Sequence, residues 1–364
     1  MAKCGRKESG TTMSTRPTDL TGRNGRLRAC GAADGKNRWP ALLARRASRV
    51  LLLLGLPLLA QDPSVIRVNV NLVRVVATVR NTAGDPVGTL HKEDFEVYDN
   101  GVLQEIGVFN RQTEQPLSVA LLVDTSGSTA KDLKYESDSA ARFLHALLSE
   151  GNPQDVVALW SFNYDIHVER SFTRNYASLE ARLKLLHGEA GTSLYDAIYY
   201  AARELEPREG RKVVVVVTDG GDTTSSRDLH AALKQAQLAD AVIYPVVVLP
   251  ITNDAGRNIG GENALTIMAQ GTGGRTFLPT VGAQLDKAFA DIVTELRTQY
   301  MLGFYPHNVP LTKDPFHRLE VRVKSPALRA SARNGYYGES EGSGGTPGAR
   351  ISVAPERKKS REDN

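Results

Sequence analysis

The segment LSVALLVDTSGST, residues 117–129, joins an apolar run directly to three oxygen-bearing side chains. Its apolar part is rich in leucine and valine and predicts a strand buried on both faces, as in parallel sheets. Asp124, Ser126 and Ser128 follow at alternate positions. A loop in this place lies at the carboxyl edge of the sheet, where open α/β sheets bind ligands. Three hard oxygen donors with no His or Cys nearby favour Mg²⁺ or Mn²⁺ over zinc.

The charge of the chain is distributed unevenly. The 364 residues carry a formal net charge of +4, but residues 1–60 hold 12 Lys and Arg against 3 Asp and Glu. Residues 61–364 have 33 basic against 38 acidic side chains, a net charge of −5. This distribution does not indicate nucleic-acid binding. Because Cys4 and Cys30 also lie in the first 60 residues, the rest of the chain has neither a disulfide nor a thiolate metal site.

Residues 1–60 are predicted to be a leader that contains a secretory signal. Arg45, Arg46 and Arg49 precede an apolar core at residues 50–60, which ends in the small residue Ala60. The core is shorter than the roughly 20 residues that span a bilayer. We therefore expect export to the periplasm or the cell exterior, with no integral membrane span after cleavage. A leader that stays attached as a short anchor, and a buried helix, are the alternatives.

Residues 64–112 are predicted to form a small all-β module. Apolar residues alternate in part over 65–79, and a strand at 95–98 leads through Asn100-Gly101, a hairpin signal, to a returning strand at 103–109. Alternation returns in residues 300–338, and a last strand is expected at 330–337. A module of about 45 residues has a marginal core by itself. We therefore expect the two segments to combine into one sheet sandwich.

Between these segments, residues 115–299 alternate predicted strands with predicted helices. Strands are expected at 117–123, 156–162, 166–171, 213–217, 242–249 and 275–277, and helices at 132–149, 176–186, 192–205, 227–239, 262–270 and 284–298. The turn at residues 163–165 pairs the second strand with the third. The alternation favours an α/β fold with a doubly wound, mostly parallel sheet and helices on both faces. Residues 339–364 are rich in Gly, Ser, Pro and charge and are predicted to be a disordered tail.

Two further loops are expected to bring oxygen atoms to the same edge of the sheet. Thr192 stands at the start of a predicted helix, and Asp219 directly follows the valine strand at 213–217 and Thr218. We expect Ser126, Ser128 and Thr192 to contact the ion directly. Asp124 and Asp219 are expected to hold water molecules bound to the ion. Such an ion stays electropositive and attracts one more anionic oxygen from outside. The alternative is that Asp124 and the serines only cap the following helix.

The Asp124-x-Ser126-x-Ser128 loop, with the distant Thr192 and Asp219, resembles the complete metal-ion-dependent adhesion site (MIDAS) of von Willebrand factor type A (VWA) domains. The flanking sequences EDFEV at 93–97 and YMLGFYP at 300–306 are similar to an exported VWA-related family that is abundant in acidobacteria. The resemblance covers about residues 65–337. It implies a Rossmann-like VWA domain at residues 115–299 and a Mg²⁺ or Mn²⁺ site. We expect an Asp or Glu of a partner protein to complete the coordination of the ion.

Three functions fit these features. We expect an adhesion or assembly module that binds a protein through the ion and is not an enzyme. The second interpretation is a structural envelope component in which the ion only ties loops together or the site is vestigial. The third is a metal-dependent hydrolase. The residues around Ser126 do not form the Gly-x-Ser-x-Gly elbow of serine hydrolases, and the chain has no His-Glu-x-x-His motif.

Overall fold

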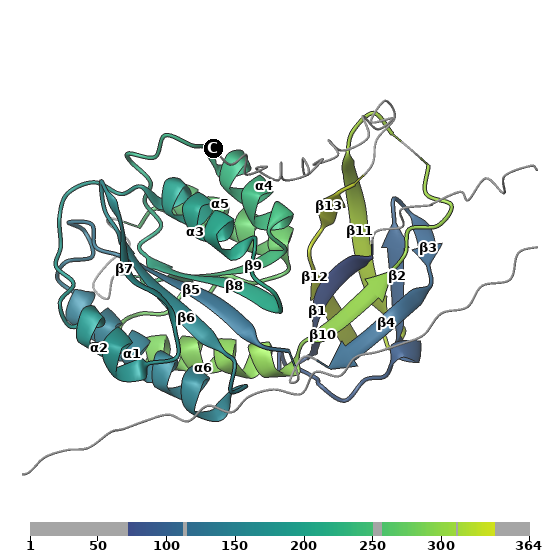
Figure 1. Ribbon diagram of the computed structural model, residues 1–364, viewed down its shortest axis with the longest axis horizontal. Helices are drawn as coiled ribbons and strands as arrows, with labels where there is room; N and C mark the ends of the chain where they lie inside the picture. Colours follow the sequence, from purple (N-terminus) through teal and green to yellow (C-terminus); the bar gives the residue numbers. More distant parts are fainter. Residues whose placement is uncertain (1–71, 112–114, 250–256, 311, 339–364) are drawn as a thin grey trace, which may run out of the picture. The chain divides into compact units, whose positions relative to one another are not determined.

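The computed structural model describes residues 72–111, 115–249, 257–310 and 312–338. All of them lie in a single compact unit. The predicted leader, the strand positions before Leu72 and the predicted tail lie outside the described residues. Figure 1 shows an α/β part built around a mostly parallel sheet, and a second part built from two antiparallel sheets.

The central sheet of the α/β part has five strands in the order β7-β6-β5-β8-β9. They are β5 (Leu117–Asp124), β6 (Val156–Phe162), β7 (Ile166–Thr173), β8 (Arg211–Thr218) and β9 (Ala241–Val247). Four strands run parallel, and β7 at the edge returns antiparallel to β6, as the turn at residues 163–165 predicts. Every residue of β5 is buried, because this strand has neighbours on both sides and helices over both faces.

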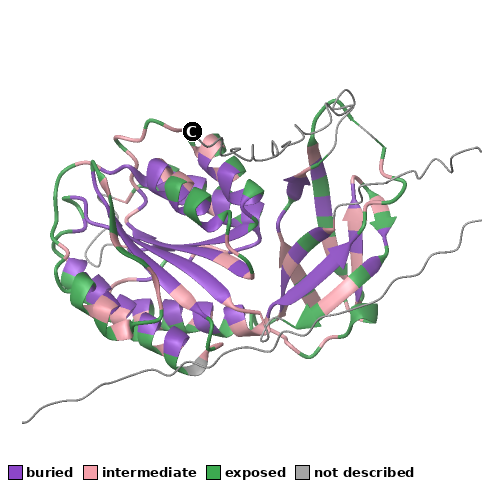
Figure 2. Ribbon diagram, viewed as in Figure 1, coloured by how far each residue is buried: buried purple, intermediate pink, exposed green. Residues whose placement is uncertain are grey.

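Helices cover both faces of this sheet (Figure 1). One face carries α1 (Leu133–Glu150), α2 (Tyr176–Leu183) and α6 (Ala283–Thr298), and the other carries α3 (Leu194–Leu205), α4 (Leu229–Leu238) and α5 (Ile259–Thr272). Alternate strand residues point to opposite faces, so Leu121 packs with the first group of helices and Leu122 with the second. Figure 2 shows the buried residues along the central strands and on the inner sides of the helices. The predicted doubly wound α/β fold is confirmed.

The second part is a sandwich of two antiparallel sheets, in the orders β12-β1-β10-β4 and β13-β11-β2-β3. The strands are β1 (Val73–Asn81), β2 (Phe95–Asp99), β3 (Val102–Gln104), β4 (Ile106–Arg111), β10 (Tyr300–Phe304), β11 (Phe316–Val323), β12 (Leu328–Ala332) and β13 (Gly335–Tyr337). A short 3₁₀ helix, η1 (Lys92–Asp94), precedes β2. Because β1 pairs with β10 and β2 with β11, segments before and after the α/β part share both sheets. Their inner faces enclose a third apolar core.

Four details of the predicted elements were wrong. The strands expected at 103–109 and 330–337 are each divided between the two sheets of the sandwich, as β3 and β4 and as β12 and β13. The chain crosses from one sheet to the other at these points because each half pairs with a different neighbour. Residues 275–277 form no strand in the described chain, where Phe277 makes only an isolated bridge to Val246. The helix expected from Thr192 begins at Leu194, so Thr192 stays in the preceding loop.

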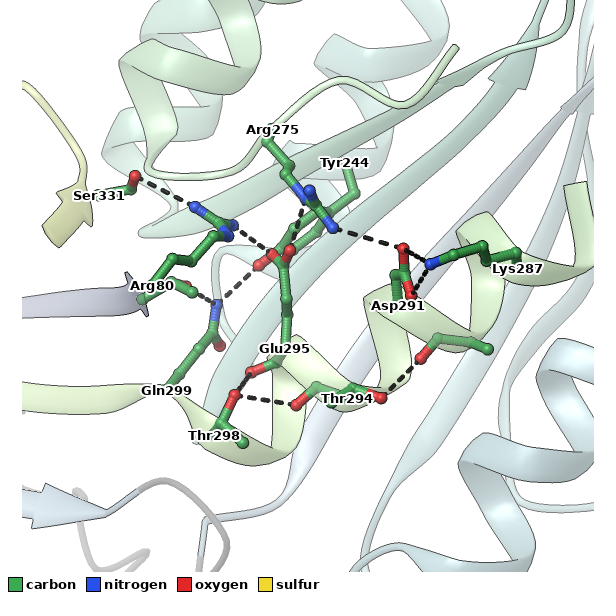
Figure 3. Close-up of polar contacts among 12 residues, drawn as sticks. Arg80, Tyr244, Arg275, Lys287, Asp291, Thr294, Glu295, Thr298, Gln299 and Ser331 are labelled. Atoms are coloured by element: carbon green, nitrogen blue, oxygen red, sulfur yellow. Dashed lines mark hydrogen bonds and ion pairs between the residues drawn. The ribbon is translucent and has the colours of Figure 1, made fainter. Parts of the chain in front are cut away.

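A buried glutamate on α6 connects the α/β part to the sandwich (Figure 3). The carboxylate of Glu295 pairs with Arg80 of β1 at 2.7 Å and with Arg275 at 2.5 Å, and its side chain is 1% exposed. Just beyond the helix, Gln299 Nε2 donates a hydrogen bond of 2.7 Å to the hydroxyl of Tyr244 in β9. Because β10 follows directly, these contacts fix the end of α6 between the five-stranded sheet and the sandwich.

We expect Glu295→Ala to lower the free energy of unfolding by about 3 kcal/mol, because it leaves the guanidinium groups of Arg80 and Arg275 without their shared carboxylate. Chemical denaturation followed by circular dichroism measures this change. The matched control is Asp291→Ala, one turn earlier on α6, whose carboxylate lies 3.8 Å from Arg275 and is 36% exposed. An exposed pair contributes about 0–1 kcal/mol, so equal losses in the two variants would contradict this account of Glu295.

Candidate metal centre

The loop that follows β5 brings two serine hydroxyls together. Ser126 Oγ and Ser128 Oγ lie 3.1 Å apart. The turn is held by Thr129, whose hydroxyl contacts the carbonyl oxygens of Asp124 and Ser126, each at 3.0 Å. The N-cap of α1 is Asp132, which makes no side-chain capping bond. The alternative that Asp124 and the serines cap this helix therefore finds no support in the described loop.

Asp124 is the last residue of β5 and is fully buried. Its Oδ1 accepts a hydrogen bond of 2.8 Å from the Ser126 backbone N–H, and its Oδ2 accepts one of 2.6 Å from the Thr218 hydroxyl. Burial raises the pKa of Asp124 to about 6, although these hydrogen bonds oppose the shift. The nearby charge of Asp219 raises the pKa further. The carboxylate is thus oriented in advance, and a cation beside it would favour its charged form.

Thr218 is a member of this site that the sequence analysis left without a role. It is the last residue of β8, and the parallel pairing of β5 with β8 aligns Val123 with Val217. The next residues on the two strands, Asp124 and Thr218, therefore meet at the edge of the sheet. The signal for Thr218 in the sequence is its position: a residue with a hydroxyl group immediately precedes Asp219.

Asp219 lies in the loop that follows β8 and is partly buried. Its Oδ1 accepts a hydrogen bond of 3.1 Å from the backbone N–H of Gly221. Its charge raises the pKa of both Asp124 and Glu136, so Asp219 lies within electrostatic range of the buried carboxylates. The structure therefore places the residue on the predicted side of the sheet, while its contact with water on an ion stays a prediction.

The loop that contains Thr192 lies against both of the other loops. Glu189 donates a backbone hydrogen bond of 2.8 Å to the carbonyl of Thr125, and Thr223 donates one of 2.8 Å to the carbonyl of Thr192. The Thr192 side chain is buried. Within the described residues, no hydrogen bond joins its hydroxyl to Asp124, Ser126, Ser128 or Asp219. The three predicted loops thus converge, and direct coordination by Thr192 stays a prediction.

A third buried carboxylate, Glu136 on α1, was missed by the sequence analysis. The residue is 1% exposed, and its Oε2 has no hydrogen-bond partner in the described part of the chain. Burial raises its pKa to about 8, and the charges of Asp124, Asp132 and Asp219 act in the same direction. The signal in the sequence was an acidic residue four positions before Ala140, on the face of the helix that enters the core.

The donor set fits a hard divalent cation. Neighbouring ligands of an octahedral Mg²⁺ ion at 2.0–2.1 Å lie about 2.9 Å apart, close to the 3.1 Å between the two serine hydroxyls. Across the described ranges, no three His, Cys, Asp or Glu side chains gather in a way that could hold a metal by themselves. A cation at this edge of the sheet would therefore need hydroxyl ligands beside the carboxylates of Asp124 and Asp219.

Residues 118–289 match the sequence model of the von Willebrand factor type A domain. The chain contains a VWA domain. The match begins in β5 and extends into α6, so the VWA domain supplies every residue of the candidate metal centre. The sandwich is built from the chain on either side of the VWA domain. None of the helices that the structure describes is long and apolar enough to cross a membrane.

The chain with its VWA domain is similar to several solved structures. The conserved hypothetical protein BatB from Bacteroides thetaiotaomicron is 21% identical, with a TM-score of 0.39, over 48% of this chain and 97% of that one. The vWF domain of the type V pili tip protein Mfa5 from Porphyromonas gingivalis is 16% identical, with a TM-score of 0.43, over 49% and 94%. A von Willebrand factor type A protein from Catenulispora acidiphila is 12% identical, with a TM-score of 0.43, over 68% and 74%. A search of curated proteins found no match.

We expect the metal-free VWA domain to lose stability as the pH rises from about 4.5 to about 8. In this window the folded state keeps a proton on Glu136 that the unfolded state releases, because the pKa is raised from 4.5 to about 8. Each such proton contributes up to about 1.4 kcal/mol per pH unit to the slope. Glu136→Gln removes the proton and should flatten the slope by up to that amount. Chemical denaturation in EDTA at several pH values measures this slope. Glu180→Gln, on α2, is the control. Identical slopes for wild type and Glu136→Gln would contradict the assignment of the shift to Glu136.

Proposed function

We propose that the protein is an exported adhesion or assembly module whose VWA domain binds a partner protein through a Mg²⁺ or Mn²⁺ ion. Asp124, Ser126, Ser128, Thr192 and Asp219 would together form a complete MIDAS. The observation that carries the proposal is the pair of serine hydroxyls, 3.1 Å apart, beside the buried carboxylate of Asp124. The chain would belong to the exported VWA-related family that is abundant in acidobacteria.

The residues of the site would have different roles toward the ion. The hydroxyls of Ser126, Ser128 and Thr192 would contact it, and Asp124 and Asp219 would hold its water ligands. Asp124 is suited to this role because the Ser126 N–H and the Thr218 hydroxyl fix its orientation and leave further lone pairs free. When bound, the ion supplies a Lewis-acidic position for one additional oxygen from outside.

A carboxylate is the best partner group for such a site. The direct ligands are neutral hydroxyls, so the ion keeps much of its positive charge and favours an Asp or Glu side chain of a partner protein. Nucleic acid is disfavoured because residues 61–364 have 33 basic against 38 acidic side chains. The apolar core at residues 50–60, after three arginines, supports export.

The two other interpretations have less support from the geometry. Backbone hydrogen bonds already join the three loops, from Glu189 to Thr125 and from Thr223 to Thr192. An ion is therefore not needed merely to hold the loops together. A hydrolase that used Ser126 as its nucleophile would need a base beside it, and the Ser126 hydroxyl instead contacts that of Ser128.

We expect calorimetric titration of Mg²⁺ or Mn²⁺ into the full chain to show one saturable site. Ser126→Ala removes a direct ligand and should weaken binding by at least tenfold, since even groups outside direct contact with a metal typically contribute about 10–100-fold. Ser171→Ala, at an exposed position on β7, is the control and should bind as wild type does. A folded Ser126→Ala variant with wild-type affinity would show that the ion does not bind at this loop.

We also expect acetate to reach the bound ion. With Mn²⁺ in the site, acetate should replace a bound water and lower the relaxation rate of the solvent protons, whereas neutral acetamide at the same concentration should not. Bound Mn²⁺ that is insensitive to acetate would favour the loop-stabilising interpretation. Hydrolysis of ester or phosphate substrates that depends on Mn²⁺ and is lost in Ser126→Ala would favour the hydrolase.

A further inference from the structure

A cavity of about 140 Å³ lies at the amino-terminal edge of the VWA sheet. Its walls include Arg211 and Lys212, which begin β8, together with Arg74 of β1 in the sandwich. The metal centre adjoins Thr218 at the other end of β8, so the two sites lie at opposite ends of one strand. One water molecule needs about 10–15 Å³ of such volume. The cavity can therefore hold several waters or one small anion.

The lining of the cavity is strongly basic. Its five cationic side chains are Arg74, Arg208, Arg211, Lys212 and Arg333, and its acidic residues are Glu209 and Asp240. Asp240 is already paired with Arg333, and Glu209 is exposed. Asp155, which does not line the cavity, only partly offsets the charge of Arg211. Asp240 and Glu206 also act on Lys212. The cationic side chains that line the cavity nevertheless outnumber the acidic ones.

Two of these arginines are buried and carry an unused hydrogen-bond donor. Arg211 is 6% exposed and Arg333 is 8% exposed, and in the described part of the chain the Nε of each is buried without an acceptor. Arg211 Nη1 donates to the carbonyl of Leu296, and Arg333 Nη2 donates to that of Arg74 at 2.5 Å. A buried donor without an acceptor costs about 1–3 kcal/mol. Guanidinium groups match the paired oxygens of phosphates and carboxylates.

We propose that this cavity binds a small oxyanion with two negative charges, between Arg211 of the VWA domain and Arg333 of the sandwich. Phosphate, sulfate and short dicarboxylates share the required chemistry. The bound anion neutralises the basic lining of the cavity. Because the two arginines belong to different parts of the structure, the anion also bridges the VWA domain and the sandwich. This site involves no metal ion and is separate from the proposed MIDAS.

Calorimetric titration of inorganic phosphate, sulfate and malonate into the full chain tests this proposal, in EDTA and at constant ionic strength set with NaCl. We expect one saturable site for at least one dianion, and the comparison of phosphate with malonate shows whether the site prefers a tetrahedral or a dicarboxylate ligand. Binding should persist in Ser126→Ala, because the cavity is independent of the metal centre. Heats no larger than those of added chloride for all three anions would overturn the proposal.

Two variants locate the anion. Arg211→Lys keeps the positive charge but removes the planar guanidinium group, and Arg74→Gln removes a charge from an exposed side chain. Each should weaken binding by about tenfold or more. Arg182→Gln, at an exposed position on α2, makes the same change in net charge away from the cavity and should leave binding unchanged. Wild-type affinity in both cavity variants, or an equal loss in Arg182→Gln, would show that the anion binds elsewhere or without specificity.

Discussion

The parallel pairing of β5 with β8 determines where the groups of the metal centre lie. The register aligns Val123 with Val217, so Asp124 and Thr218 meet at the next position and form a hydrogen bond of 2.6 Å. Asp219 then follows immediately on the same edge. A slip of one residue would turn every side chain of the shifted strand to the opposite face, and the packing of the two apolar cores opposes it. The placement of a polar site thus depends on how the apolar residues of the two strands pack.

The sandwich depends on the same sheet, because its strands come from segments that the VWA domain separates. Arg211, the first residue of β8, contacts both the entrance and the exit of that domain: its backbone N–H donates to the carbonyl of Pro116 at 2.9 Å, and its side chain donates to that of Leu296. The folded VWA domain therefore holds its own ends close together. This lowers the entropic cost of pairing β1 with β10 across the long intervening segment, which explains how two short β segments form one stable core.

Local patterns predicted most of the fold and much of the site. The valine run of β8, the Asn100-Gly101 turn and the Asp124–Ser128 loop each carry their signal within a few residues. Features that depend on pairing between distant segments were not predictable in this way. Thr218 acquires its role only from the register with β5, and the strand expected at 330–337 divides because its halves meet different neighbours. Glu136 was predictable in principle, as an acid on an apolar helical face. The basic cavity was not, because Arg74, Arg211 and Arg333 come together only in the folded chain.

The two ends of β8 differ in charge: Asp124 and Asp219 lie near Thr218, and basic side chains lie around Arg211. Eight residues of strand place these ends about 23 Å apart, a distance at which two unit charges interact by about 0.7 kcal/mol at an effective dielectric constant of about 20. Direct electrostatic coupling between the two ends of β8 is therefore weak. A connection through packed and hydrogen-bonded elements would couple the two ends more effectively. The end of α6 provides one, since Leu296 accepts a hydrogen bond from Arg211 while the adjacent Glu295 pairs with Arg80 and Arg275. A displacement of α6 along its axis would break these contacts together. These contacts hold the end of α6 that lies nearest the cavity, and a movement of the helix would have to break the Glu295 ion pairs.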